Sequence, residues 1–216
     1  MASETGYFSP VFFIYANRFT TANMEINNMK RFIKDVCGLF ALKASDIFYY
    51  EKYSIVKSSL IILFVAMASY LAVPVPADTI AGFIFVITAN FLSYIIGALL
   101  LCLWLKIKKL FVSFAALYSL SALASMIYLL VIPIGILSKW LNFPELLVFF
   151  FITLFPYWLL ILTSAISKST NTSKRFALLG ILLISLLLII FSMMMQILGI
   201  EMGVLLPFDA LPVDGL

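Results

Sequence analysis

The side chains that could do acid–base or metal chemistry are few in this sequence and lie far apart. Histidine, the commonest general base and haem ligand, does not occur. Cys37 and Cys102 lack a metal-binding spacing, so we expect neither a metal site nor a disulfide. Asp46, Glu51 and Glu145 lie nearest to apolar runs and are the candidates for an interfacial lipid-modifying enzyme. Because nothing in their spacing groups them, we expect a protein with no catalytic residues and no cofactor.

Neutral polar and small side chains inside the apolar runs are the remaining candidates. One set falls at helical i, i+3, i+4 and i+7 positions: Asn90, Ser93, Tyr94 and Gly97. A second set shares a face of the next apolar run: Tyr118, Ser121, Ser125 and Tyr128. Such residues let membrane helices pack closely, and polar pairs across the contact contribute about 0.6 to 2 kcal/mol each. We therefore expect helix packing, and the alternative is a polar cavity for a lipid headgroup or a small solute.

The elements that carry these residues are membrane-spanning helices. Of the 216 residues, 64% are hydrophobic and 11% charged, whereas soluble domains carry about 25% charged residues. Crossing the hydrocarbon takes about 20 apolar residues in a helix that satisfies its own backbone. Five runs without a charged residue meet this length: 58–76, 79–105, 110–137, 146–166 and 176–200. The predicted fold is an all-α integral membrane protein with five transmembrane helices.

The segments outside the spans are predicted from their polarity. Within the cytoplasmic segment 1–57, residues 24–40 place apolar side chains at a period of 3.6 with basic residues between them, which predicts an amphipathic helix. This helix either lies in the membrane interface or packs on the protein's own helices. Trp104 and Trp140 are predicted anchors at the two headgroup layers. Residues 201–216 form a predicted acidic tail on the outer side.

Basic residues indicate the orientation. Thirteen of the fourteen Lys and Arg fall on one side of the predicted spans, and Lys139 alone falls on the other. Because positive charge stays cytoplasmic, we expect the N-terminus inside and the C-terminus outside, in a bacterial cytoplasmic (inner) membrane. Five residues are candidate contacts to anionic inner-leaflet lipid: Lys106, Lys108, Lys109, Lys174 and Arg175. The net charge of +4 serves topology, so no nucleic-acid partner is expected.

Proline in the fourth run is a candidate kink. Pro156 lies in the middle of the run, where proline removes a backbone hydrogen bond. In a membrane helix this serves architecture or, in some cases, a hinge.

The chain resembles the Yip-domain family of small membrane proteins. The resemblance rests on five spans, on a cytoplasmic segment leading into the first span, and on "WLLILTSAISKSTNTSKRFALLGILLISLLL" at 158–188. It covers roughly residues 35–200. The Pro/Gln-rich tail of eukaryotic members is missing, and their acidic-Leu-Tyr-Gly-Pro motif is at most echoed by "SDIFYY" at 45–50. The resemblance therefore implies a bacterial-type member that organises partners or lipids, without Rab binding.

Two functions follow as expectations. The first is a non-enzymatic scaffold that organises lipids, a protein partner or further copies of itself. The alternative is a permease subunit or another component of small-solute or lipid transport. A cavity that reaches Asn90 and Tyr94 would favour the alternative, whereas tight packing around them would favour the scaffold.

Overall fold

A computed structural model describes residues 28–72, 80–143 and 145–205. Residues 28–40 are helical and are called here the N-terminal helix. The elements after it are η1 (Ile47–Lys52), α2 (Ile55–Ala72), α3 (Ile80–Lys106), α4 (Phe114–Ser125), η2 (Met126–Leu130), α5 (Val131–Leu141), α6 (Glu145–Ser169) and α7 (Lys174–Glu201). The described chain therefore consists of helices that are joined by short turns.

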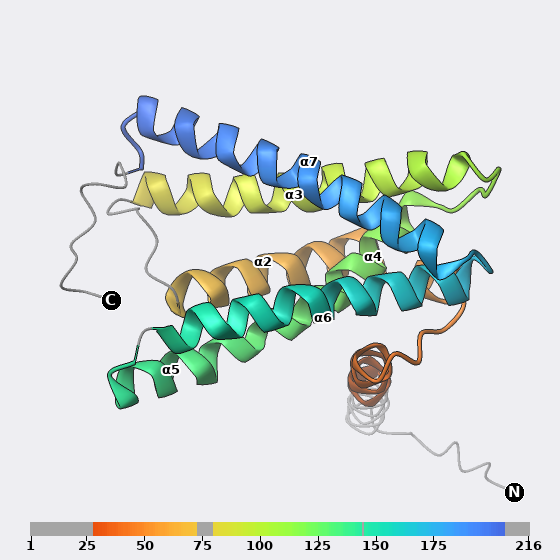
Figure 1. Cartoon of the computed structure of the whole chain (residues 1–216), viewed down its shortest axis with the longest axis horizontal. Coiled ribbons are helices and arrows are strands. Elements are labelled where there is room, and N and C mark those ends of the chain that lie inside the picture. Colours follow the sequence, from red (N-terminus) through yellow and green to blue (C-terminus); the bar gives the residue numbers. More distant parts are fainter. Residues whose placement is uncertain (1–27, 73–79, 144, 206–216) are drawn as a thin grey trace, which may run out of the picture.

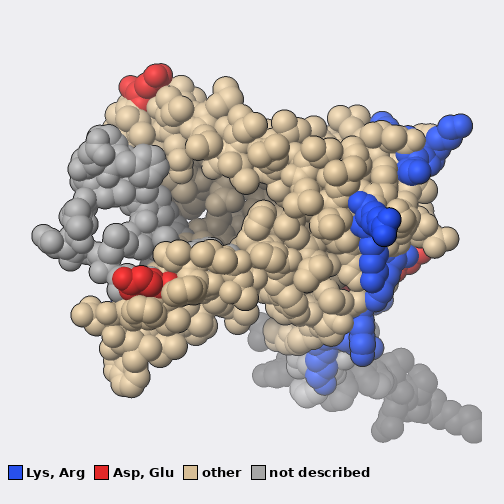
Figure 2. Space-filling view, viewed as in Figure 1, with Lys and Arg blue, Asp and Glu red and all other residues tan. Residues whose placement is uncertain are grey.

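The long helices run up and down along one axis (Figure 1). α3 packs along α7, α2 along α4, and α6 contacts both α5 and α7. α3 ends and α7 begins at the same end of the bundle, which we call the basic end because the Lys and Arg side chains gather there (Figure 2). α6 begins and α7 ends at the opposite end, so successive long segments alternate in direction, with α4, η2 and α5 together forming one of them.

Four helices are long and apolar enough to cross a membrane, so the chain is built as an integral membrane protein. They are Ile80–Lys106, the continuous run Phe114–Leu141, Glu145–Ser169 and Lys174–Glu201. The first predicted span, 58–76, begins earlier, at Ile55. Among the described residues it counts only as a shorter apolar helix over Ile55–Ser69. Residues 73–79 lie outside the described part of the chain, as do 24–27 of the predicted amphipathic helix and most of the predicted tail.

α4 lies at the centre of the bundle. Its N-terminus is capped by the Ser113 hydroxyl, which accepts from the backbone N–H of Ala116 at 3.2 Å. Every residue from Ala116 to Ser125 is buried. The third span then continues through the 3₁₀ stretch η2 before α5. Pro133 explains this tightening, because its ring cannot sit against the carbonyl of Leu129 in a regular α-helix.

Glycines set the spacing of α3 and α7. A Cβ on Gly180 would collide with the Trp104 ring, whose indole N–H donates to the carbonyl of Phe176 at 3.2 Å. Trp104 also stacks on the Phe176 ring at 5.0 Å. Trp104 therefore packs against α7 as well, and its place at a headgroup layer stays a prediction. Trp140, by contrast, is exposed beside Lys139.

Candidate functional site

A cavity of about 470 Å³ lies inside the bundle, among α2, α3, α4, η2, α6 and α7. Figure 2 shows the hollow between the α3–α7 pair and the helices on the other side of the bundle. Its walls are mostly aliphatic, with neutral polar side chains at intervals. No charged residue is among the described residues that line it. A volume of this size and character is typical of small-molecule sites.

α3 contributes the polar side of the cavity. Asn90, Ser93, Tyr94 and Gly97 line it together, as their shared helix face requires. Asn90 is the eleventh residue of α3, so it lies about 15 Å from the start of that helix, near the middle of a 30 Å hydrocarbon layer. The Ser93 hydroxyl donates to the carbonyl of Ala89 at 2.9 Å. Among the described residues, the Asn90 side chain has no hydrogen-bond partner.

α7 faces this polar side with two serines. Leu188 lies against Gly97, and Gly180 lies against Trp104, which fixes the antiparallel register of α3 and α7. In that register Ser192 is level with Ser93. Ser185 lines the cavity seven residues closer to the basic end, about two helical turns away.

α6 lines one side of the cavity with aromatic rings. Phe155 and Trp158 line it, and their ring centroids are 6.2 Å apart. The Tyr128 ring of η2 lies 6.4 Å from that of Trp158. The indole N–H of Trp158 is buried and, within the described chain, has no acceptor. Pro156 lies between these two wall residues, and α6 remains helical through it.

The structure divides the polar residues predicted in the third span. Ser121 and Tyr128 line the cavity. Tyr118 and Ser125 do not: the Tyr118 hydroxyl hydrogen-bonds with that of Ser59 on α2 at 3.1 Å, and the Ser125 hydroxyl donates to the carbonyl of Ala122 at 2.7 Å. Ser121 and Tyr128 therefore lie at the edge of this helix face that borders the cavity, whereas Tyr118 and Ser125 lie at the edge that packs within the bundle.

Packing of α2 on α4 uses a second polar contact that the sequence prediction did not assign. The hydroxyls of Ser58 and Ser119 are 2.8 Å apart, and both residues are buried. Ser119 also donates to the backbone carbonyl of Tyr53 at 3.2 Å. These bonds satisfy polar groups at a helix contact in the way that membrane helices require.

Four lining residues with a polar side-chain atom were missed in the sequence: Ser69, Trp158, Ser185 and Ser192. Ser185 and Ser192 are seven residues apart, so their shared helix face was a usable signal. Trp158 carried no signal of its own, because an aromatic residue in an apolar run packs in many ways.

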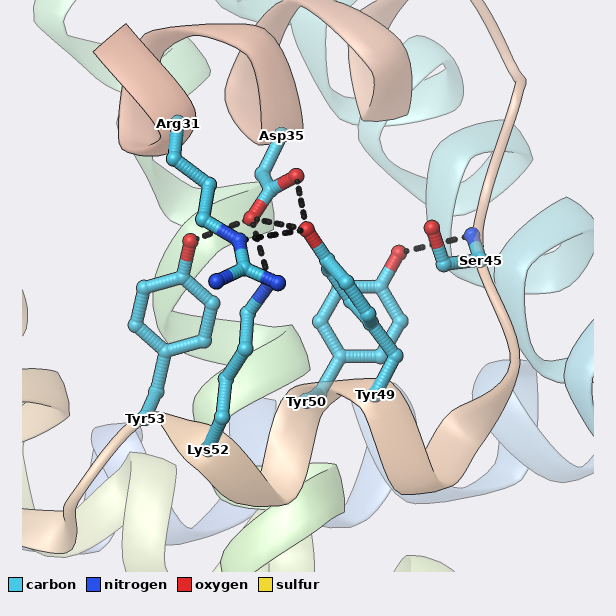
Figure 3. A network of polar contacts seen from close by, with 7 residues as sticks. All are labelled: Arg31, Asp35, Ser45, Tyr49, Tyr50, Lys52 and Tyr53. Carbon is cyan, nitrogen blue, oxygen red and sulfur yellow. Dashed lines mark hydrogen bonds and ion pairs between the residues drawn. The ribbon is translucent and has the colours of Figure 1, made fainter. Parts of the chain in front are cut away.

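A polar cluster joins the N-terminal helix to η1 at the basic end (Figure 3). We call it the entry cluster: Arg31, Asp35, Tyr49, Lys52 and Tyr53. The Asp35 carboxylate accepts hydrogen bonds from the hydroxyls of Tyr49, at 2.7 Å, and Tyr53, at 2.5 Å. It also pairs with the Lys52 ammonium at 3.1 Å, and only 8% of the Asp35 side chain is exposed. The cluster therefore fastens the N-terminal helix through one carboxylate.

The charge state of the entry cluster follows from these contacts. Burial on its own would raise the pKa of the Asp35 carboxyl. Hydrogen bonds from Tyr53 and Tyr49, together with Lys52, outweigh burial and hold that pKa below its ordinary value. Burial and the bond to Asp35 raise the pKa of Tyr53, so this phenol stays protonated as a donor.

The N-terminal helix has one apolar face that the bundle covers only in part. Val36 and Leu39 are buried against the bundle, whereas Met29 and Ile33 are exposed. Figure 1 shows this helix running crosswise to the bundle axis. Packing on the protein's own helices is therefore present, and an apolar edge is still left uncovered.

The candidate lipid contacts Lys106, Lys108, Lys109, Lys174 and Arg175 are all exposed at the basic end. The three acids considered for an enzyme are not brought together. Asp46 caps η1 by accepting from the N–H of Phe48, and Glu51 accepts from the Ser113 hydroxyl. Glu145 begins α6 at the opposite end of the bundle.

No protein-family model, curated protein or solved structure matches the chain. The resemblance to Yip-domain proteins therefore stays a prediction, and function is argued from the cavity and the basic end.

Proposed function

We propose that the protein binds an amphipathic small molecule or lipid in the cavity, as a component of lipid or small-solute transport. The supporting observation is the lining itself: Asn90, Ser93 and Tyr94 border a space of about 470 Å³ at mid-depth in the bundle. Residues that served only helix packing would be in contact with a neighbouring helix, as Tyr118 and Ser119 are. Space beside a polar helix face is what a bound molecule requires.

The proposed setting is a bacterial cytoplasmic membrane with the basic end inside. The grouping of Lys and Arg at one end of the bundle supports this orientation. The cavity then lies within the hydrocarbon, where a membrane-dissolved molecule enters from the side, between α6 and α7.

Native mass spectrometry of the protein released from a mild detergent tests the binding function. We expect the wild type to carry a bound amphiphile and Ser93→Leu to lose most of it, because the larger side chain fills the cavity. Thr88→Leu is the matched control, since Thr88 lies on the same helix, is exposed and does not line the cavity. Equal retention by the two variants, or no bound molecule on the wild type, would contradict the proposal.

A second candidate function is a scaffold that organises anionic lipid at its basic end. The crosswise N-terminal helix supports it, because Met29 and Ile33 are exposed beside Lys30, Arg31 and Lys34, a pattern suited to an anionic membrane surface. Replacing Lys106, Lys108 and Lys109 by Gln should then reduce co-purified phosphatidylglycerol relative to phosphatidylethanolamine. An unchanged ratio would count against this candidate.

A further inference from the structure

We infer that the cavity is selective for an uncharged amphiphile with one hydroxyl or carbonyl group, held at the level of Asn90 and Trp158. This inference rests on the proposed function and adds the class of ligand. It follows from the charge of the lining, from the Asn90 amide and from the aliphatic wall.

The lack of charged side chains in the described lining excludes ionic headgroups. The described lining residues include no Lys, Arg, Asp or Glu. The polar level of the cavity lies about 15 Å from the nearer helix ends, since Asn90 and Phe155 are each the eleventh residue of their helices. A phosphate, carboxylate or ammonium at that depth would lack a counter-charge, which costs at least about 2.5 kcal/mol in a membrane.

The Asn90 amide specifies a hydrogen-bonding oxygen on the ligand. This side chain is exposed, has no hydrogen-bond partner among the described residues and offers both donors and an acceptor. Ser93, by contrast, is already bonded to Ala89. The Trp158 indole N–H also lacks an acceptor in the described part of the chain, but its nitrogen is fully buried, so Trp158 contributes its ring to the cavity wall and no hydrogen bond to the ligand. A carbonyl would accept from the Asn90 amide, and a hydroxyl would also use the Asn90 oxygen.

The rest of the ligand has an aliphatic surface to lie against. From the polar level toward the basic end the cavity is lined mainly by Leu101, Leu162, Ile181 and Ile184, with Ser185 beside them. These four aliphatic side chains have no polar atoms, so they suit a hydrocarbon chain. The hollow opens on the flank of the bundle (Figure 2), which gives a membrane-dissolved molecule direct access.

Quenching of Trp158 fluorescence by brominated probes tests this selectivity. Three probes of equal chain length differ only at one end: a primary alcohol, an alkane and a sulfonate, which stays anionic. The fluorescence contributed by Trp158 is the difference in fluorescence between the wild type and Trp158→Phe, measured on the full chain in vesicles. We expect saturable quenching by the alcohol, with half-saturation roughly three- to tenfold lower than for the alkane, as one hydrogen bond in a membrane implies. The sulfonate should bind at least tenfold more weakly than the alcohol.

Variants on α3 assign the selectivity to the cavity. Asn90→Leu should make the alcohol bind no better than the alkane, and it places an apolar side chain in hydrocarbon, so folding should be preserved. Thr88→Leu should keep the selectivity of the wild type. Sulfonate binding equal to alcohol binding, or no preference for alcohol over alkane, would overturn the inference and leave the proposed function standing. Absence of saturable quenching by all three probes would instead overturn the proposed function.

Discussion

Asp35 is the single carboxylate that fastens the N-terminal helix to η1. Its contacts with Tyr49, Tyr53 and Lys52 are well formed, and its side chain is nearly buried. Removing one partner of such a group leaves donors without an acceptor, which costs more than the bonds themselves contribute.

Replacing Asp35 should therefore lower the stability of this region. We expect Asp35→Asn to reduce the free energy of unfolding by roughly 1 to 3 kcal/mol at pH 7, since three donors lose a charged acceptor. Thermal unfolding in detergent measures the change. Asp46→Asn is the control, because Asn caps a helix as well as Asp does. Equal loss in both variants would contradict the role of the entry cluster.

Stability should also depend on pH through this residue. Because the pKa of Asp35 is lower in the folded protein than in the unfolded chain, its contribution is complete above about pH 4, the ordinary Asp value, and is lost as the pH falls further. The wild type should thus lose its advantage over Asp35→Asn as the pH falls below about 4. A difference that stays constant as the pH is lowered would show that Asp35 titrates normally.

Gly180 shows how a residue can act against its own propensity. Alanine normally stabilises a helix relative to glycine by about 1 kcal/mol. At Gly180, however, the new methyl group would collide with the rigid Trp104 ring, so we expect Gly180→Ala to destabilise the protein by roughly 1 to 3 kcal/mol. Gly97→Ala meets only a flexible Leu188 methyl group at 3.2 Å and should change stability little. Unfolding curves that rank the two variants in the reverse order would contradict this packing.

At the scale of elements, α4 explains why the third span is rich in alanine and serine. Small side chains allow α2, α3 and α6 to approach it, and serine hydroxyls bond across the contact or to their own helix. All residues from Ala116 to Ser125 are buried, as close packing of these helices requires.

Serines of α4 should differ in their tolerance of a larger side chain. Ser125 is fully buried away from the cavity, so Ser125→Leu should overpack the core and cost about 1 to 3 kcal/mol. Ser121 borders the cavity, so Ser121→Leu has space and should be milder. Thermal unfolding of the two variants, side by side, measures the difference. Equal destabilisation would indicate that the cavity is closed at Ser121.

The presence of the helices was predictable, because long apolar runs without charged residues have few alternatives to a helix when they cross a membrane. The polar face of α3 was predictable for a related reason: helical spacing alone puts Asn90 and Tyr94 together. The 3₁₀ stretch η2 was not, because it depends on how Pro133 disturbs the preceding turn. Nor could the sequence tell which polar residues face a neighbour and which face a space, since that depends on the register between helices distant in the chain.

The whole molecule combines a basic end, an aliphatic body and a cavity at mid-depth. Within the described residues α2 gives a shorter apolar helix, Ile55–Ser69, than the other spans, and Val65 and Ala66 of α2 form part of the cavity wall. If α2 crosses, the chain makes an odd number of crossings and the cavity is surrounded by spanning helices. The position of α2 therefore decides whether the cavity lies in the membrane.

Labelling of single cysteines with an impermeant thiol reagent in intact cells tests most directly whether α2 crosses the membrane. Cys37 and Cys102 are first replaced by Ser, and cysteine is introduced in turn at Lys57, Lys109, Asn142 and Met202, which are all exposed. We predict labelling at Asn142 and Met202 in intact cells, and at Lys57 and Lys109 only after permeabilisation. Labelling of Lys57 together with Met202 would show that α2 does not cross, and would contradict a ligand cavity enclosed by five membrane helices.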